Sequence, residues 1–204
     1  MKKAPNIYLI FTALTIFLHF TLSWWKPLNK GQSIFYLDEQ ITTGMLLSVL
    51  GLFLTGVIYF INVEYQKSKK QKLISQAFGL LFWALMLDEY FEMHEYLNTL
   101  IKDLLGNTSK LGVLSHLSWV FPLSIILLFI CGFILYSLKS ETNKVAKKSL
   151  IIGLILALTV LPLEVIGGST YGNWYYVIFV GLEEGIELVA ISFFMKSALN
   201  KGKT

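Results

Sequence analysis

The chain has 204 residues, of which 55% are hydrophobic and only 15% are charged. A soluble domain carries charge on about a quarter of its residues, so this composition argues against an ordinary soluble protein and for a membrane protein. The net charge is +4, and every basic residue that contributes to it is a lysine. Without arginine the chain lacks the planar, bidentate group that reads nucleic acids, and we expect no nucleic-acid partner.

Long apolar stretches follow one another through the chain, and six of them approach the ~20 residues that cross ~30 Å of hydrocarbon. They cover approximately residues 6–25, 41–63, 73–98, 112–137, 149–167 and 174–196. No small-x-small cleavage pattern follows the first stretch, so we expect a retained span rather than a removed signal peptide. The sequence therefore predicts an all-α integral membrane bundle of six transmembrane helices, forming a single domain over residues 1–204.

The lysines predict the orientation of this bundle. All of them except Lys26, Lys30, Lys102 and Lys110 fall in segments that six spans would place on one side of the membrane. By the positive-inside rule that side is cytoplasmic, so both termini are expected in the cytoplasm. Membrane lipids are the expected surroundings, and we expect a bacterial cytoplasmic membrane.

Acidic residues gather within the spans instead of the loops. A continuous helix over 73–98 would place Asp88, Glu92 and Glu95 on one face, with Glu89 to one side and His94 to the other. In the last span Glu183 and Glu187 are one turn apart, and Glu184 is adjacent. Span five adds Glu164, while the remaining histidines, His19 and His116, fall in spans one and four.

Such acids need a counterion. A charged side chain at the bilayer centre costs about 2.5–3.5 kcal/mol on insertion scales. No arginine exists and no lysine lies at that depth, so bound metal, shared protons or both must neutralise the cluster. Carboxylates and imidazoles are ordinary ligands of zinc, iron and manganese, and we expect such a divalent metal as cofactor. The predicted ligands are Asp88, Glu92, His94, Glu95, His116, Glu164, Glu183 and Glu187. The predicted catalytic acids are Glu89 and Glu184.

Two short motifs carry a resemblance. The string Leu87-Asp88-Glu89 with His94-Glu95, followed by Leu182-Glu183-Glu184 and Glu187-Leu188, resembles a pattern in small uncharacterised bacterial polytopic membrane proteins. In these, Asp-Glu-x-x-x-x-His-Glu lies in a middle span and Glu-Glu-x-x-Glu in the last one. The resemblance covers about a fifth of the chain. It implies that the acids of both motifs and His94 form one functional set, and it implies no activity.

Three functions fit these features. The first is a metal-dependent membrane enzyme, in which a glutamate acts as general base on a lipid-like or small-molecule substrate. The second is a cation- or proton-coupled transporter, and the third is a non-catalytic membrane subunit or sensor. A transporter needs polar residues through both halves of the membrane. Apolar stretches such as 125–135 and 151–157 favour a site open only to the outer side, and hence the enzyme. The sequence indicates no oligomeric state.

Overall fold

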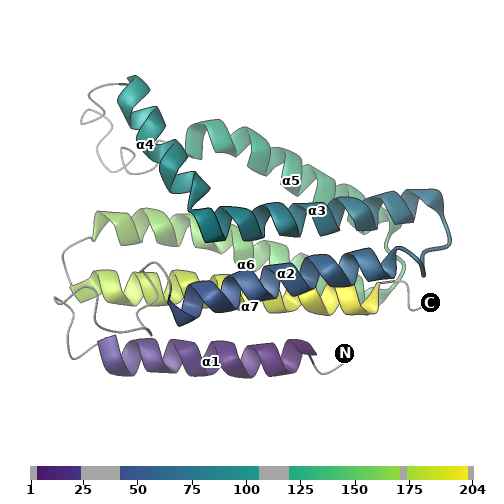
Figure 1. The fold of residues 1–204 in the computed structure, drawn as a ribbon, viewed down its shortest axis with the longest axis horizontal. Helices are drawn as coiled ribbons and strands as arrows, with labels where there is room; N and C mark the ends of the chain where they lie inside the picture. The colour runs from purple at the N-terminus through teal and green to yellow at the C-terminus, as the bar shows by residue number, and fades with distance from the viewer. Residues whose placement is uncertain (1–3, 24–41, 106–119, 171–173, 202–204) are drawn as a thin grey trace.

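The computed structural model describes residues 4–23, 42–105, 120–170 and 174–201. These residues form helices, most of which lie side by side along the long axis of the molecule (Figure 1). In chain order the helices are α1 (Ala4–Ser23), α2 (Thr43–Asn62), α3 (Lys69–Phe91), α4 (Met93–Leu105), α5 (Val120–Ser140), α6 (Lys144–Ser169) and α7 (Trp174–Asn200). The predicted all-α class is confirmed.

Short polar side chains begin three of these helices. The Thr42 hydroxyl accepts a hydrogen bond from the Met45 N–H at 3.2 Å, and Ser68 does the same for Gln71 at 3.1 Å. At the start of α6, Asn143 Oδ1 accepts from the N–H groups of Val145 and Ala146. Each cap satisfies donors that the first helical turn leaves unpaired, which is why these apolar helices begin at these residues.

Helix α7 occupies the middle of the bundle. It packs against α1, α2 and α6, and α2 also packs against α3. A group of aromatic rings fills the space among α2, α3 and α7. The Tyr59 ring stacks on Phe78 with centroids 4.8 Å apart, and Phe82 meets Phe194 at 5.2 Å. This core holds α3 and α7 in fixed relative positions.

Two glycines let α1 approach α7 closely. A methyl group added at Gly181 would lie 2.7 Å from His19 Cδ2 and 2.7 Å from Phe20 Cζ. One at Gly185 would lie 2.9 Å from Ile16 Cδ1. Small residues four apart are the usual means by which membrane helices bring their backbones together.

The Gly181→Ala variant should therefore be less stable by about 1–3 kcal/mol, because the added methyl overpacks the α1–α7 contact. Thermal unfolding in mild detergent measures the change. Gly132→Ala in α5 is the matched control, since no heavy atom lies within 4 Å of its added methyl. An equal loss of stability in both variants would contradict the close contact.

Three described helices are long and apolar enough to cross a membrane: Ala4–Leu22, Thr43–Asn62 and Lys144–Gly167. The described part of α5 contributes a shorter apolar segment, Leu128–Ser140. Acids interrupt the apolar sequence of α3 at Asp88 and Glu89 and that of α7 at its three glutamates. The coarse prediction of a helical chain suited to a membrane is confirmed by these helices.

The surface of α1 suits lipid better than water. Its outward residues are large and apolar, with Ile10 67% and Phe17 62% exposed. Its inward residues are polar, and Tyr8, Thr12, Thr15 and His19 are all buried. A surface helix of a soluble protein shows the opposite arrangement, with apolar residues inward and polar residues in solvent. The distribution is compatible with a membrane protein.

The third predicted helix is wrong in one respect. The sequence indicates one continuous helix over 73–98, but α3 ends at Phe91 and α4 begins at Met93. Between them Glu92 adopts a left-handed conformation, with φ 51° and ψ 41°. Helix α4 consequently turns away from the axis of α3 (Figure 1). Asp88, Glu92 and Glu95 therefore do not form a stripe on one continuous helix.

Candidate functional site

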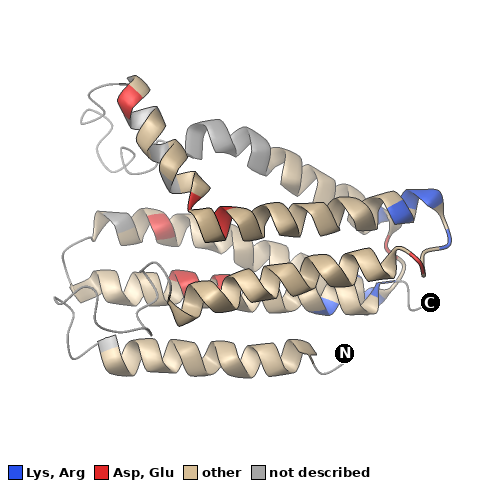
Figure 2. Ribbon diagram, viewed as in Figure 1, with Lys and Arg blue, Asp and Glu red and all other residues tan. Residues whose placement is uncertain are grey.

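Within the described helices, acidic and basic residues gather at opposite ends of the bundle. Figure 2 shows acidic residues of α3, α6 and α7 towards one end, while lysines gather at the other, beside the start of α3 and the end of α7. We call the first the acidic end, defined by Asp88, Glu89, Glu164 and Glu183. We call the second the lysine-rich end, defined by Lys67, Lys69, Lys70, Lys72 and Lys201. The lysines of the described helices thus lie at one end of the bundle, while Lys26, Lys30, Lys102 and Lys110, predicted on the other side, lie outside the residues whose side chains are described.

Asp88 and His94 form a two-point contact at the acidic end. Asp88 Oδ1 accepts from the backbone N–H of His94 at 3.0 Å, and Oδ2 lies 3.2 Å from His94 Nδ1. Asp88 therefore caps the first turn of α4 and orients the imidazole at the same time. With the proton on Nδ1 donated to Asp88, the neutral ring keeps its basic lone pair on Nε2. That arrangement suits a proton acceptor or a metal ligand.

The Glu92 backbone makes this contact possible. Its left-handed conformation turns the chain so that His94 lies beside Asp88. The Glu92 backbone N–H donates to the Asp88 carbonyl. Among the described residues, Glu92 alone of the non-glycine residues has a positive φ. A residue with a Cβ pays about 1–2 kcal/mol for this conformation, so the break in the helix is under strain.

Replacing Glu92 by glycine should raise thermal stability by about 1 kcal/mol, because glycine adopts a positive φ without steric cost. Glu92→Ala is the matched control: it removes the same carboxylate but keeps the Cβ. We expect Gly to be more stable than Ala in detergent unfolding. Equal stability of the two variants would show that φ at this position is not positive in the folded protein.

Glu187 of α7 lies at the centre of the acidic cluster. Its electrostatic neighbours are Glu183 of α7, Glu89 of α3, Glu164 of α6 and His94 of α4. Glu89 in turn interacts with Asp88, His94 and Glu92, and it neighbours Ser48 of α2. The Glu183 carboxylate reaches across to α6, with Oε2 3.6 Å from the point where a Cβ on Gly167 would lie. Five helices thus contribute to one group of side chains.

The remaining predicted residues are placed less closely. Glu184 is partly buried, on the stripe of α7 that continues through Leu188 to Ile191, which packs against Gly51 of α2. Glu95 belongs to α4, but its side chain lies outside the described residues. His116 lies outside them altogether. The structure therefore brings together Asp88, Glu89, Glu92, His94, Glu164, Glu183 and Glu187 out of the predicted set.

A ready-made metal site is not found among the described residues. No three histidine, cysteine, aspartate or glutamate side chains there have the spacing that holds a metal ion. Glu95 and His116, two predicted ligands, are not part of this comparison. The described carboxylates therefore interact electrostatically without the close spacing of a preformed metal site.

The polar stripe of α1 is a part of the site that hydropathy does not reveal. The Tyr8 hydroxyl donates to the Leu47 carbonyl at 3.1 Å, and its electrostatic neighbours are Glu187 and Glu89. Further along α1, His19 Nε2 lies 3.0 Å from the Val177 carbonyl of α7. The sequence signal is a polar residue every three or four positions, at Tyr8, Thr12, Thr15 and His19, within an otherwise apolar segment.

Comparison with known proteins gives a family without an assigned activity. No curated protein and no solved structure matches the chain. A family model described as a domain of unknown function (DUF8692) matches residues 7–199, which include every helix that contributes to the acidic cluster. The chain belongs to this family, a domain of unknown function (DUF8692).

Proposed function

We propose that the chain is a proton- or cation-coupled membrane carrier of six transmembrane helices, in which the acidic cluster around Glu187 takes up the coupling ion. One observation carries the proposal: Tyr8, on the buried polar stripe of α1, is near enough to Glu187 and Glu89 to interact electrostatically with both. Ionisable side chains inside a membrane bundle commonly mark ion pathways and proton relays.

Topology supports the direction of such a pathway. The start of α1 and the end of α7 lie at the lysine-rich end (Figures 1 and 2). Under the positive-inside rule that end faces the cytoplasm, and the acidic end faces outward in a bacterial cytoplasmic membrane. The coupling ion would enter at Asp88 and His94, pass the carboxylates of Glu89 and Glu187, and continue past Tyr8.

Buried polar side chains beyond the acidic cluster favour a carrier over a site open only to the outer side. Apart from the stripe of α1, Ser48 and Thr55 of α2 and Ser192 of α7 are all buried. Apolar stretches along 125–135 and 151–157 remain, but they lie on α5 and α6. Polar groups therefore extend along α1, α2 and α7 through much of the bundle.

Reconstitution into phospholipid vesicles tests the proposal. Purified protein should dissipate an imposed pH gradient, or carry a labelled monovalent or divalent cation, faster than vesicles without protein. Glu64→Gln, which removes an exposed acid between α2 and α3, should behave as wild type. Vesicles that hold every gradient as well as protein-free vesicles would reject the carrier.

A metal-dependent membrane enzyme is the second candidate, and the Asp88–His94 pair favours it. Histidines that bind metals commonly donate a hydrogen bond from their other ring nitrogen to a carboxylate, and His94 Nδ1 lies 3.2 Å from Asp88 Oδ2. Zinc, iron or manganese would then be held by His94 with carboxylates from α3 and α7. Metal analysis after purification without chelators tests this candidate: stoichiometric metal that Glu187→Gln and His94→Ala both lose would support it, and metal-free active protein would exclude it.

A further inference from the structure

Lys201 is buried at the lysine-rich end, away from the acidic cluster. It follows the last turn of α7 and is only 7% exposed. Its Nζ lies 4.9 Å from the ring centroid of Phe78 and 5.3 Å from that of Tyr59. Lysine is seldom buried without a partner for its charge. Glu141, in the connection between α5 and α6, is its electrostatic neighbour.

Buried hydrogen-bond donors occur on the segments that end beside Lys201. Among the described residues, Gln66 Nε2 and the Ser75 hydroxyl belong to the buried side-chain groups that have no hydrogen-bond partner. Leaving such a buried group unpaired costs about 1–3 kcal/mol. Two such donors at the same end of the bundle as a buried cation point to a missing acceptor.

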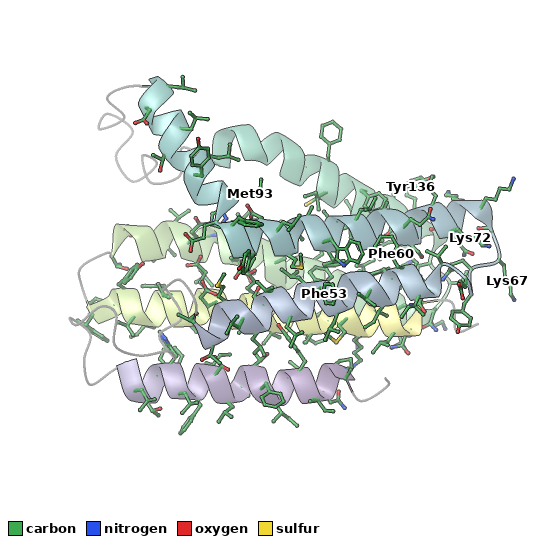
Figure 3. The ribbon with its side chains drawn as sticks, in the orientation of Figure 1. Phe53, Phe60, Lys67, Lys72, Met93 and Tyr136 are labelled. Atoms are coloured by element: carbon green, nitrogen blue, oxygen red, sulfur yellow. The ribbon has the colours of Figure 1, made fainter. Side chains whose placement is uncertain are left out.

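The elements of the bundle place these groups at the same end. Ser75 is one turn from Phe78 on the same face of α3, towards the lysine-rich end. The Asn62 side-chain amide donates to the Ala198 carbonyl, which joins the ends of α2 and α7. Gln66 comes four residues after Asn62, and Lys201 comes three residues after Ala198. Both therefore lie beyond this hydrogen bond, towards the lysine-rich end. Figure 3 shows Lys67 and Lys72 projecting from this end, so further positive charge surrounds it.

We propose that Lys201, Gln66 and Ser75 form a binding site for the anionic phosphate group of a ligand at the lysine-rich end of the bundle. A phosphate group supplies several strong acceptor oxygens and a negative charge, so it satisfies the two donors and the ammonium together. A water molecule would satisfy the hydroxyl and the amide, but it would not neutralise Lys201. The exposed lysines at the same end raise the local concentration of such anions.

The phosphate group could belong to a free anion or to an anionic lipid headgroup, and both reach this end. The test uses thermal unfolding of the full-length protein in nanodiscs. One arm contains phosphatidylcholine alone and is titrated with inorganic phosphate. The other replaces part of the phosphatidylcholine with phosphatidylglycerol and contains no added phosphate. A rise in unfolding midpoint in the first arm identifies the free anion, and a rise in the second alone identifies the headgroup.

Lys201→Met is compared with Lys196→Met, which removes an exposed lysine of α7. Phosphate stabilises folded proteins generally through exclusion from their surface, so the difference between these two variants is the readout. We expect Lys196→Met to respond as wild type and Lys201→Met to bind about tenfold more weakly or worse, as expected for the loss of a charged hydrogen bond.

Gln66→Leu keeps the test decisive if Lys201→Met does not fold. It removes one of the unpaired donors while leaving the ammonium in place. It should also weaken the response to phosphate or phosphatidylglycerol relative to Lys196→Met. Equal responses of wild type, Gln66→Leu and Lys196→Met in both arms would overturn the proposal. So would the absence of any rise in both arms.

Discussion

Replacing Glu187 by glutamine is expected to reduce ion flux through reconstituted vesicles by about 10²–10⁴-fold, the range typical of losing one positioned proton-transfer group. Glutamine keeps the size and much of the hydrogen bonding of glutamate but neither binds nor releases a proton. Glu187 is also the residue whose electrostatic neighbours come from α3, α4 and α6 as well as α7. Its loss therefore interrupts the cluster where its members meet.

The matched control for Glu187→Gln is Glu64→Gln, which makes the same chemical change on an exposed residue outside the helices. Glu187→Asp should retain part of the flux, because it keeps an ionisable group but withdraws it by one methylene. Circular dichroism and the thermal midpoint establish that each variant is folded. A folded Glu187→Gln protein with wild-type flux would remove Glu187 from the pathway.

The response of Tyr8→Phe separates a pathway from a local site. If the ion passes from Glu187 to the stripe of α1, loss of the Tyr8 hydroxyl should slow flux while leaving ion binding at the acidic end intact. An enzyme confined to Asp88, His94 and the nearby glutamates would tolerate the same change. Measuring binding and flux on one Tyr8→Phe preparation therefore compares the two candidate functions directly.

Much of the helix arrangement follows from simple sequence features. Apolar length places α1, α2 and α6 within a few residues of their observed ends, because lipid-suited helices need an uninterrupted apolar stretch. The lysines fall together at one end because the α2–α3 and α5–α6 connections both lie at that end. Glu183 and Glu187 share a face of α7 because residues four apart always do in a helix.

The break between α3 and α4 at Glu92 cannot be predicted from the sequence. No glycine or proline marks it, and the surrounding residues continue an ordinary helical pattern. What stabilises it is a contact between Asp88 and His94, six residues apart, which forms only after the helix has turned. Periodicity describes a regular helix, and in a regular helix His94 would lie to one side of the acidic stripe. In the folded chain His94 instead pairs with Asp88.

Hydropathy also conceals the stripe of α1. Threonine and tyrosine lower the mean hydropathy of an apolar segment only slightly, and averaging along the chain removes the information about which face they occupy. In the bundle Tyr8 and Thr12 face inward while Ile7 and Phe11 face outward. Which residues those inward groups meet depends on the position of α1 beside α7, and that position is set by the small residues Gly181 and Gly185.

Lys201 should make the stability of the protein rise between about pH 8 and pH 10.5. Burial lowers the pKa of Lys201 from 10.5 to about 8, although the nearby Glu141 opposes the shift. In this pH window the unfolded chain keeps the proton that the folded chain has released. Raising the pH therefore favours the folded state, and the effect is absent below pH 8, where both states are protonated.

A shift of this size corresponds to about 3 kcal/mol between the two ends of the window, at about 1.4 kcal/mol per pKa unit. The measurement is the unfolding free energy of wild type minus that of Lys201→Met as pH rises, which cancels the titration of the other lysines and tyrosines. Lys196→Met should keep the wild-type slope. If the unfolding free energy of Lys201→Met rose with pH as steeply as that of wild type, Lys201 would not have a lowered pKa in the folded protein.

Binding of a phosphate group beside Lys201 should change the pH dependence of the unfolding free energy. An anion beside Lys201 favours the charged ammonium and raises its pKa towards the ordinary value. Saturating phosphate, or phosphatidylglycerol if the headgroup is the ligand, should then flatten the rise in stability between pH 8 and pH 10.5. Because the anion acts on the protonation of Lys201, wild type with ligand should titrate as Lys201→Met does without it. A steep slope that survives saturation would place the phosphate group away from Lys201.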